Sequence, residues 1–248
     1  RIPMRDGTEL AADLYLPDGG GRFPVIIERT PYSKNACRNN QAPYFAERGY
    51  AVLIQDVRGR FASPGIFYLY QDEGWGKNQD GYDTIEWAGK QSWSDGKVGT
   101  MGVSYSCFNQ NMTAPTQPPH LKAMFCSDSA ASWFGHKYRG GALGGQGIDW
   151  LTDNNEAARP ILMNRPGRIE GDEQLQDWLN WNTRRIERNQ SILESLITPN
   201  VTNDLTHPVY DDYWRQLAPV EHAEKFTVPV FYTSGWYDRY PHEATRMF

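Results

Sequence analysis

Ser104 is the residue whose type and setting best suit chemistry in this sequence of 248 residues. Residues 97–103 are typical of a short buried strand, residues 108–112 begin a helical pattern, and Gly102 stands two positions before the serine. A serine on a tight turn between a strand and a helix presents its hydroxyl clear of the sheet, and the N–H groups at the helix start can face a developing oxyanion. The pattern predicts a nucleophile elbow at Ser104, although G-x-S by itself is frequent in sequences.

Asp238 is a candidate partner for this serine. A serine that transfers acyl groups needs a base to take its proton and a carboxylate to orient that base. Asp238 follows an apolar run at residues 228–233 that is typical of a buried strand, and it comes after Ser104 in the chain, as the acid of an α/β-hydrolase does. A turn aspartate that ends the strand is the alternative, and the residue types alone leave both interpretations open.

Strands and helices alternate from residue 23 to residue 128, which indicates a doubly wound and mostly parallel sheet. Near-continuous apolar runs are typical of strands buried on both faces. The predicted strands are residues 10–16, 23–29, 50–56, 97–103, 121–127 and 228–233, and the predicted helices between them are residues 42–48 and 80–91.

The pattern changes after residue 135, where a glycine-rich stretch leads to a strongly helical one at residues 172–197. We therefore expect a hydrolase core at residues 1–135, a helical insertion at 136–215, and the continued core at 216–248. The insertion is either purely structural or a cap that excludes water from a site, and its place between two sheet strands favours the cap.

The composition excludes several classes of function. Lys and Arg number 25 against 30 Asp and Glu, and the net charge of −5 without a long run of either sign argues against a nucleic-acid partner. No apolar stretch approaches the length that spans a membrane. The spacing of Cys37, Cys107 and Cys126 resembles neither a disulfide framework nor a metal site, and nothing suggests a cofactor. We expect a soluble protein, cytoplasmic or secreted, that could form a homo-oligomer.

A series of motifs occurs in the order seen in a known family. The blocks are Asp6-Gly7, Arg29-Thr30-Pro31-Tyr32, Asp56-Val57-Arg58-Gly59, Ser63-Pro64-Gly65, Asp80 to Trp87, Gly102-Val103-Ser104-Tyr105, His207-Pro208 through Trp214, and Gly235-Trp236-Tyr237-Asp238. This order resembles the X-Pro dipeptidyl-peptidase and cocaine esterase-like α/β-hydrolases, which include α-amino-acid ester hydrolases and glutaryl cephalosporin acylases.

The resemblance implies an α/β-hydrolase fold and a role for each candidate. Ser104 would be the nucleophile, Asp238 the triad acid, and the Tyr32 hydroxyl an oxyanion donor together with the backbone N–H of Tyr105. A neutral phenol suits that role because it donates a hydrogen bond without a buried charge. The implied function is a serine hydrolase that cleaves a small-molecule acyl ester or amide through an acyl-enzyme. The alternatives are an X-Pro dipeptidyl-peptidase and a non-catalytic, truncated hydrolase scaffold.

Several further residues concern the substrate. Three aromatic residues could line an acyl pocket or could equally belong to the core: Tyr240, Trp133 and Tyr138. Three basic residues could favour an acyl group that carries a carboxylate, such as glutaryl, or could be solvated surface charges: Arg239, Lys137 and Arg139. Arg239, Tyr240 and Pro241 follow Asp238 directly, where α-amino-acid ester hydrolases carry extra carboxylates, and this disfavours the version of the family that binds a substrate ammonium.

The chain departs from the family pattern at two further points. Cys107 stands where the family usually has glycine, so its side chain could alter the elbow. No base is identifiable, because none of the five histidines stands where the family places its own, some tens of residues after the acid. The resemblance therefore implies that the C-terminal part of the fold is missing, and that the histidine follows residue 248 in a longer polypeptide.

Overall fold

A computed structural model describes residues 1–37, 41–143 and 206–247. The chain forms two compact units, Arg1–His136 with Tyr210–Phe248, and Lys137–Val209. The predicted helical stretch at residues 172–197 lies outside the described residues, so the interpretation of the insertion as a cap stays a prediction.

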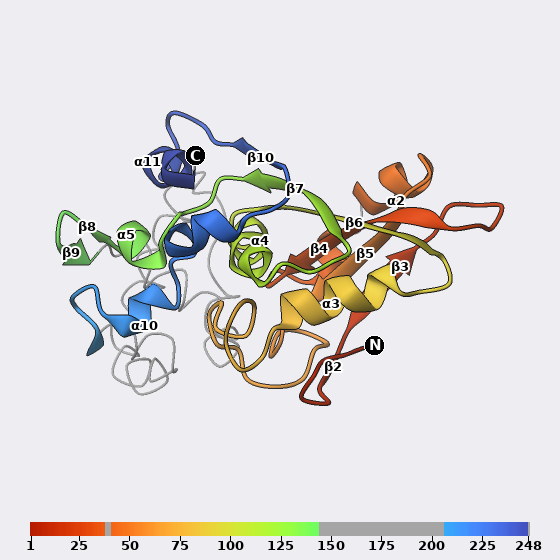
Figure 1. Ribbon diagram of the computed structural model, residues 1–248, viewed down its shortest axis with the longest axis horizontal. Coiled ribbons are helices and arrows are strands. Elements are labelled where there is room, and N and C mark those ends of the chain that lie inside the picture. The colour runs from red at the N-terminus through yellow and green to blue at the C-terminus, as the bar shows by residue number, and fades with distance from the viewer. Residues whose placement is uncertain (38–40, 144–205, 248) are drawn as a thin grey trace, which may run out of the picture. The chain divides into compact units, whose positions relative to one another are not determined.

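A six-stranded sheet organises the first unit (Figure 1). The strand order is β10-β7-β6-β4-β5-β3, in which β3 is antiparallel to β5 and every other neighbouring pair is parallel. The prediction of a mostly parallel, doubly wound sheet is confirmed. Its strands are β3 (Ala12–Tyr15), β4 (Phe23–Thr30), β5 (Ala51–Asp56), β6 (Ser94–Val103), β7 (Leu121–Ser127) and β10 (Val230–Thr233).

Helices connect the parallel strands, because a parallel pair cannot be joined by a tight turn. The connections contain α1 (Lys34–Cys37) and α2 (Gln41–Ala46), then α3 (Asp80–Gly89), then α4 (Tyr105–Thr113) with a 3-10 turn at Ala114–Thr116. Figure 1 shows α3 and α4 on one side of the sheet and α2 on the other. Shorter elements complete the first unit: β1 (Ile2–Pro3), β2 (Glu9–Leu10), α5 (Trp133–Lys137), α10 (Asp212–Arg215), 3-10 turns at Pro219–Lys225 and Thr245–Met247, and α11 (Pro241–Ala244).

The alternation of side chains along β5 separates the two layers of the core. Successive strand residues point to opposite faces. Ala51 and Leu53 accordingly belong to the main apolar cluster, together with residues of α3 and α4. Val52 and Ile54 pack on the other face with Ala42 of α2. All residues of β5 are buried, as the near-continuous apolar run predicts.

Several element boundaries differ from those predicted, and two of the differences concern the division of a strand and the start of a helix. The single strand expected at residues 10–16 is divided at Ala11: Glu9–Leu10 pairs with Ile2–Pro3, whereas Ala12–Tyr15 joins the main sheet. Helix α4 begins at Tyr105, directly after Ser104, rather than at Phe108. In the second unit, the described residues form a small antiparallel pair, β8 (Tyr138–Arg139) with β9 (Ala142–Leu143).

Candidate active site

Ser104 lies at the joint between β6 and α4, with an unusual backbone. Its φ of 59° and ψ of −117° are rare for a residue with a side chain. The turn is held on both sides: the Ser104 N–H donates to the Ser127 carbonyl at 2.9 Å, and the Ser104 carbonyl accepts from the N–H groups of Cys107 at 3.1 Å and Phe108 at 3.0 Å. Such strain persists only where the surroundings over-determine it, and it concentrates at functional sites.

Gly102 explains why helix and strand come so close at this turn. A Cβ on Gly102 would stand 2.3 Å from Ser106 Cβ and 2.8 Å from the Ser106 carbonyl carbon and oxygen. No side chain fits in that gap. The glycine two residues before Ser104 is therefore a steric requirement of the turn.

Cys107 is accommodated without disturbing the turn. Its side chain is fully buried in the main apolar cluster, on the side of α4 that faces the sheet. The neighbouring thiol of Cys126 contacts the Cys107 carbonyl oxygen at 3.4 Å. The close approach of α4 to β6 is at Gly102 and Ser106, so Cys107 does not occupy the tightest point.

Tyr32 reaches Ser104 from the end of β4. Its hydroxyl oxygen lies 3.4 Å from Ser104 Oγ. The loop that carries it is fixed, because the Tyr32 N–H donates to Thr30 Oγ1 at 3.1 Å and the carbonyl of Pro31 accepts from Arg60 Nε at 3.2 Å. The structure thus brings together two residues that are 72 positions apart in the chain.

Tyr105 directly follows Ser104, and the role of its backbone N–H as an oxyanion donor stays a prediction. It is the first residue of α4, where N–H groups have no carbonyl acceptor within the helix. Its ring is buried and stacks on Tyr70 with the ring centroids 4.2 Å apart. Burial raises the pKa of the Tyr105 phenol, so that hydroxyl stays protonated in the core.

Asp238 lies on the turn after β10, at the sheet edge that carries Ser104. Both follow the carboxyl ends of parallel strands, with β7 between their strands. The Asp238 side chain is exposed, and its Oδ1 accepts from the N–H groups of Arg239 at 2.5 Å and Tyr240 at 3.2 Å. The carboxylate is thus turned onto its own loop, and its role as triad acid stays a prediction.

Tyr240 and Trp133 lie in one aromatic cluster. Burial raises the pKa of the Tyr240 phenol above its ordinary value. The His136 ring stacks on the Tyr240 ring with the ring centroids 4.8 Å apart. The ring centroids of Trp133 and His136 are 5.1 Å apart. Trp133 also packs on Tyr70 at 5.1 Å, so the cluster continues into the core.

The other candidates for substrate contact divide between the two units. Arg239 is exposed, and its guanidinium carbon stands 5.8 Å from the centroid of the Tyr240 ring. Tyr138, Lys137 and Arg139 belong to the second unit, and their roles in binding stay predictions.

Sequence reasoning missed three residues near this site. His136 had no assigned role, yet it supports the Tyr240 ring. Glu243 is buried with 2% exposure, and its Oε2 accepts from the Ser132 N–H at 3.1 Å. Asp128 follows β7 and accepts from Ser127 Oγ at 2.9 Å. The signal that selected Asp238, a carboxylate directly after a parallel strand, also applies to Asp128.

The other histidines of the first unit have partners away from Ser104. His120 precedes β7, at the opposite sheet edge, and its Nδ1 lies 2.9 Å from Glu86 Oε2. His222 packs on Trp75, and burial lowers its pKa. His242 has an 83% exposed side chain. The expectation that none of the three acts as the base stays a prediction.

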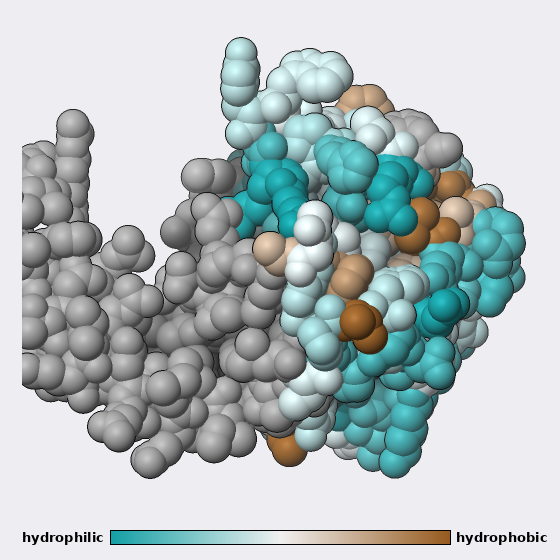
Figure 2. All heavy atoms as spheres, turned by 90° about the vertical axis from the view of Figure 1, so that its left-hand side faces the viewer, coloured by the Kyte–Doolittle hydropathy of each residue, from teal (hydrophilic) through white to brown (hydrophobic). Residues whose placement is uncertain are grey.

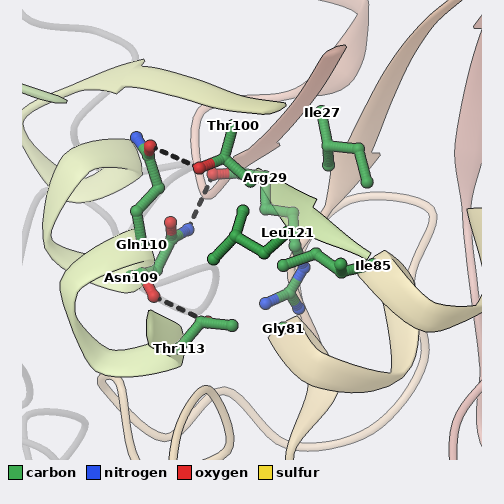
Figure 3. Close-up of a pocket in the computed structure, with 9 residues that line it drawn as sticks. All are labelled: Ile27, Arg29, Gly81, Ile85, Thr100, Asn109, Gln110, Thr113 and Leu121. Atoms are coloured by element: carbon green, nitrogen blue, oxygen red, sulfur yellow. Dashed lines mark hydrogen bonds between the residues drawn. The ribbon is translucent and has the colours of Figure 1, made fainter. Parts of the chain in front are cut away.

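An internal cavity lies away from Ser104, between the sheet and helices α3 and α4 (Figure 3). Its volume of about 10 Å³ is room for about one water molecule. In Figure 3 the Arg29 side chain extends from β4 toward Gly81, while Asn109 Nδ2 donates to the Arg29 carbonyl at 2.8 Å. The hydrogen bond from Asn109 to the Arg29 carbonyl links α4, the helix after Ser104, to β4, the strand that leads to Tyr32.

The described residues form neither a metal site nor a membrane-spanning helix. No group of three or more His, Cys, Asp or Glu in this part of the chain could hold a metal ion. Within the same residues, no helix is both long and apolar enough to cross a membrane. Among the described residues on the face shown in Figure 2, hydrophilic residues predominate and hydrophobic ones form small, separate patches.

The sheet order and its helical connections define an α/β-hydrolase fold. An α-amino acid ester hydrolase of known structure shares it, with a TM-score of 0.74 and 26% identity over 99% of this chain and 43% of that one. A CocE/NonD family hydrolase from Staphylococcus aureus has a TM-score of 0.66 over 92% of this chain and 38% of its own, and at 24% identity it supports the fold alone.

The chain belongs to the X-Pro dipeptidyl-peptidase family, S15, which residues 6–248 match. It is 33% identical to the cocaine esterase of Rhodococcus sp. (strain MB1 Bresler) over 100% of this chain. The chain spans only 45% of the length of that relative. The family predicted from the ordered motifs is confirmed.

Proposed function

We propose that the protein is a serine hydrolase that cleaves an acyl ester or amide through an acyl-enzyme formed on Ser104. The observation that carries this proposal is the Tyr32 hydroxyl at 3.4 Å from Ser104 Oγ, on a turn whose backbone is strained. Membership of the family and the likeness to an esterase support it.

Each proposed role follows from the chemistry of acyl transfer. Ser104 Oγ attacks the substrate carbonyl, and its proton passes to a base that Asp238 orients. The family resemblance implies a histidine as this base, and we assign none of the five histidines of the sequence to it. Negative charge then develops on the carbonyl oxygen, where the Tyr32 hydroxyl and the Tyr105 N–H donate hydrogen bonds. The bond to the leaving group then breaks, and the alcohol or amine departs with the proton that the base returns, which leaves the acyl-enzyme. Water attacks the acyl-enzyme in the second half of the reaction and releases the acid.

We expect stabilisation of the oxyanion by these donors to make the largest single contribution to the rate acceleration. Removing one such donor typically lowers kcat by about 10²–10³-fold. A phenol and a backbone N–H are both neutral donors, so neither brings a buried charge that the resting site would have to compensate.

The substrate is proposed to be a small acyl ester or amide whose acyl group contacts the aromatic cluster. Trp133 and Tyr240 supply flat aromatic surface in one cluster with His136. Arg239 beside Tyr240 favours an acyl group that carries a carboxylate, such as glutaryl. Steady-state rates on neutral, anionic and cationic acyl esters test this preference, and equal rates on all three would refute it.

A fluorophosphonate probe tests the nucleophile directly. We expect the full-length protein to be labelled at Ser104, and mass spectrometry of the labelled peptide locates the adduct. Ser104→Ala should lose both label and hydrolysis. Ser106→Ala is the matched control, because Ser106 is buried two residues away and its Cβ, which packs against Gly102, is retained. Wild-type protein without an adduct at Ser104 would reject the proposal.

The family description favours one alternative, an X-Pro dipeptidyl-peptidase. The two proposals differ in substrate and share the nucleophile. Hydrolysis of an Xaa-Pro anilide that outpaces hydrolysis of simple acyl esters would select the peptidase.

A further inference from the structure

Helix α4 carries three consecutive buried amide side chains: Asn109, Gln110 and Asn111. The face of a helix that packs on a sheet is ordinarily apolar, and a buried amide destabilises the fold unless its donors and acceptors are hydrogen-bonded. The partners of these amides therefore show why polar residues stand in the helix that begins directly after Ser104.

Gln110 and Asn111 attach α4 to three strands of the sheet. Gln110 Oε1 accepts from Thr100 Oγ1 of β6 at 2.7 Å, and Gln110 Nε2 donates to the Phe125 carbonyl of β7 at 3.3 Å. Asn111 Oδ1 accepts from the Tyr232 hydroxyl of β10 at 2.6 Å. These hydrogen bonds fix the position of α4 on β6, β7 and β10.

Asn109 binds a fourth strand, β4, beyond the point where its pairing with β6 ends. The pairing of β4 with β6 ends at Ile27 and Thr100, whereas its pairing with β5 continues to Thr30. Beyond Ile27, Asn109 Nδ2 donates to the Arg29 carbonyl at 2.8 Å, and Figure 3 marks this hydrogen bond between α4 and β4. A side chain of α4 therefore holds the carboxyl end of β4 where the backbone ladder no longer joins it to β6.

This hydrogen bond lies on a short route between the proposed nucleophile and the proposed oxyanion donor. Asn109 is five residues after Ser104, and Arg29 is three residues before Tyr32. The Tyr32 hydroxyl in turn lies 3.4 Å from Ser104 Oγ. A shift of the end of β4 relative to α4 would therefore change that distance.

We propose that Asn109 is a positioning residue that sets the distance of the Tyr32 hydroxyl from Ser104 Oγ. A donor stabilises an oxyanion only when it stands where the charge develops, and a misplacement of about 1 Å can lower the rate by about 10²-fold. The Asn109 amide is neutral, so it holds the strand without adding a charge to the site. The inference rests on the proposed function, because Asn109 acts through the donor that the proposed function assigns.

The variant Asn109→Ala, made in the full-length protein, removes the hydrogen bond to β4. We expect kcat on an acyl ester to fall about 5–10-fold, with KM within about twofold, because the Tyr32 hydroxyl is held less well in the transition state. A double-mutant cycle with Tyr32→Phe separates positioning from a general loosening of the helix. Once the Tyr32 hydroxyl is absent, Asn109→Ala should lower kcat by less than about twofold.

Asn111→Ala is the matched control, since it removes a buried amide of the same helix whose partner, Tyr232, lies on β10. Whatever its effect on kcat, the factor should be equal in the wild-type and Tyr32→Phe backgrounds. Urea unfolding shows whether each variant is folded. If Asn109→Ala does not fold, Asn109→Thr takes its place, because threonine nearly keeps the buried volume and its hydroxyl stands one bond closer to the backbone than Nδ2.

An equal loss of kcat for Asn109→Ala in both backgrounds, or no loss in either, would overturn the inference. So would a control whose effect also disappears in the Tyr32→Phe background. The proposed function fails by a different result, the absence of any Ser104 adduct when the wild-type protein is treated with the fluorophosphonate.

Discussion

The steric role of Gly102 gives the sharpest test of the site, through the variant Gly102→Ala. The new Cβ would stand 2.3 Å from Ser106 Cβ, about 1.1 Å closer than the 3.4 Å at which ordinary contact begins. Ser106 presents its Cβ and its backbone there, and neither can rotate away. Helix α4 must therefore move relative to β6 by about that distance, and Ser104 moves with it.

The expected effects are large on both stability and activity. Overpacking a well-packed site of this kind costs about 1–3 kcal/mol of unfolding free energy. A displacement of about 1 Å at reacting atoms can lower the rate by about 10²-fold. Urea unfolding measures the first quantity, and ester hydrolysis with fluorophosphonate labelling of the full-length protein measures the second.

Gly99→Ala provides a matched control within the same strand. Its Cβ would meet only the carbonyl oxygens of Ala123 at 3.7 Å and Val25 at 3.9 Å, which is ordinary contact. We expect Gly99→Ala to keep wild-type activity and to change stability by less than about 1 kcal/mol. If Gly102→Ala matched this control in both assays, the reasoning about the turn would be refuted.

Three further predictions concern single side chains. Tyr32→Phe should lower kcat on an acyl ester by about 10²-fold and leave KM nearly unchanged, as an oxyanion donor does; an equal loss in KM alone would contradict the role. Arg58 lowers the pKa of Asp6 from 3.8 to about 2 through a hydrogen bond, so ionised Asp6 stabilises the fold above about pH 4 and this contribution is lost as pH falls through 2. The difference in unfolding free energy between wild type and Asp6→Asn should shrink over that range, and a difference independent of pH would exclude the linkage. Cys107→Ala should cost about 1–2 kcal/mol in urea unfolding because Cys107 is fully buried, while Ser104 labelling stays within about twofold of wild type; a large loss of labelling would show that Cys107 shapes the turn.

Local patterns in the sequence were sufficient for the sheet and for the Ser104 turn. The apolar run at residues 50–56 predicted a strand buried on both faces, and every residue of β5 is buried. Gly102 was recognised in the sequence by its place two residues before Ser104. The structure explains why glycine stands there, because no side chain fits where Ser106 approaches. The start of α4 was harder to predict, since residues 104–107 are Ser, Tyr, Ser and Cys and show no helical apolar period.

The contacts that complete the site depend on long-range packing. Tyr240 meets His136 across more than a hundred residues of chain, and no local pattern indicates that the two rings stack. Glutamate is usually a surface residue, and nothing in the sequence indicates that Glu243 is buried. Its carboxylate is buried where it accepts a hydrogen bond from the Ser132 N–H. Tyr32 was assigned from family resemblance, and a loop tyrosine alone would not have been selected.

The strained backbone of Ser104 has a consequence for protein engineering. Its conformation, with φ of 59° and ψ of −117°, costs about 1–3 kcal/mol in a residue with a side chain, and much less in glycine. The exchange Ser104→Gly would therefore release strain while it removes the hydroxyl. A library screened for heat resistance alone would enrich this inactive substitution, so a directed-evolution programme on this scaffold must select turnover and thermostability together.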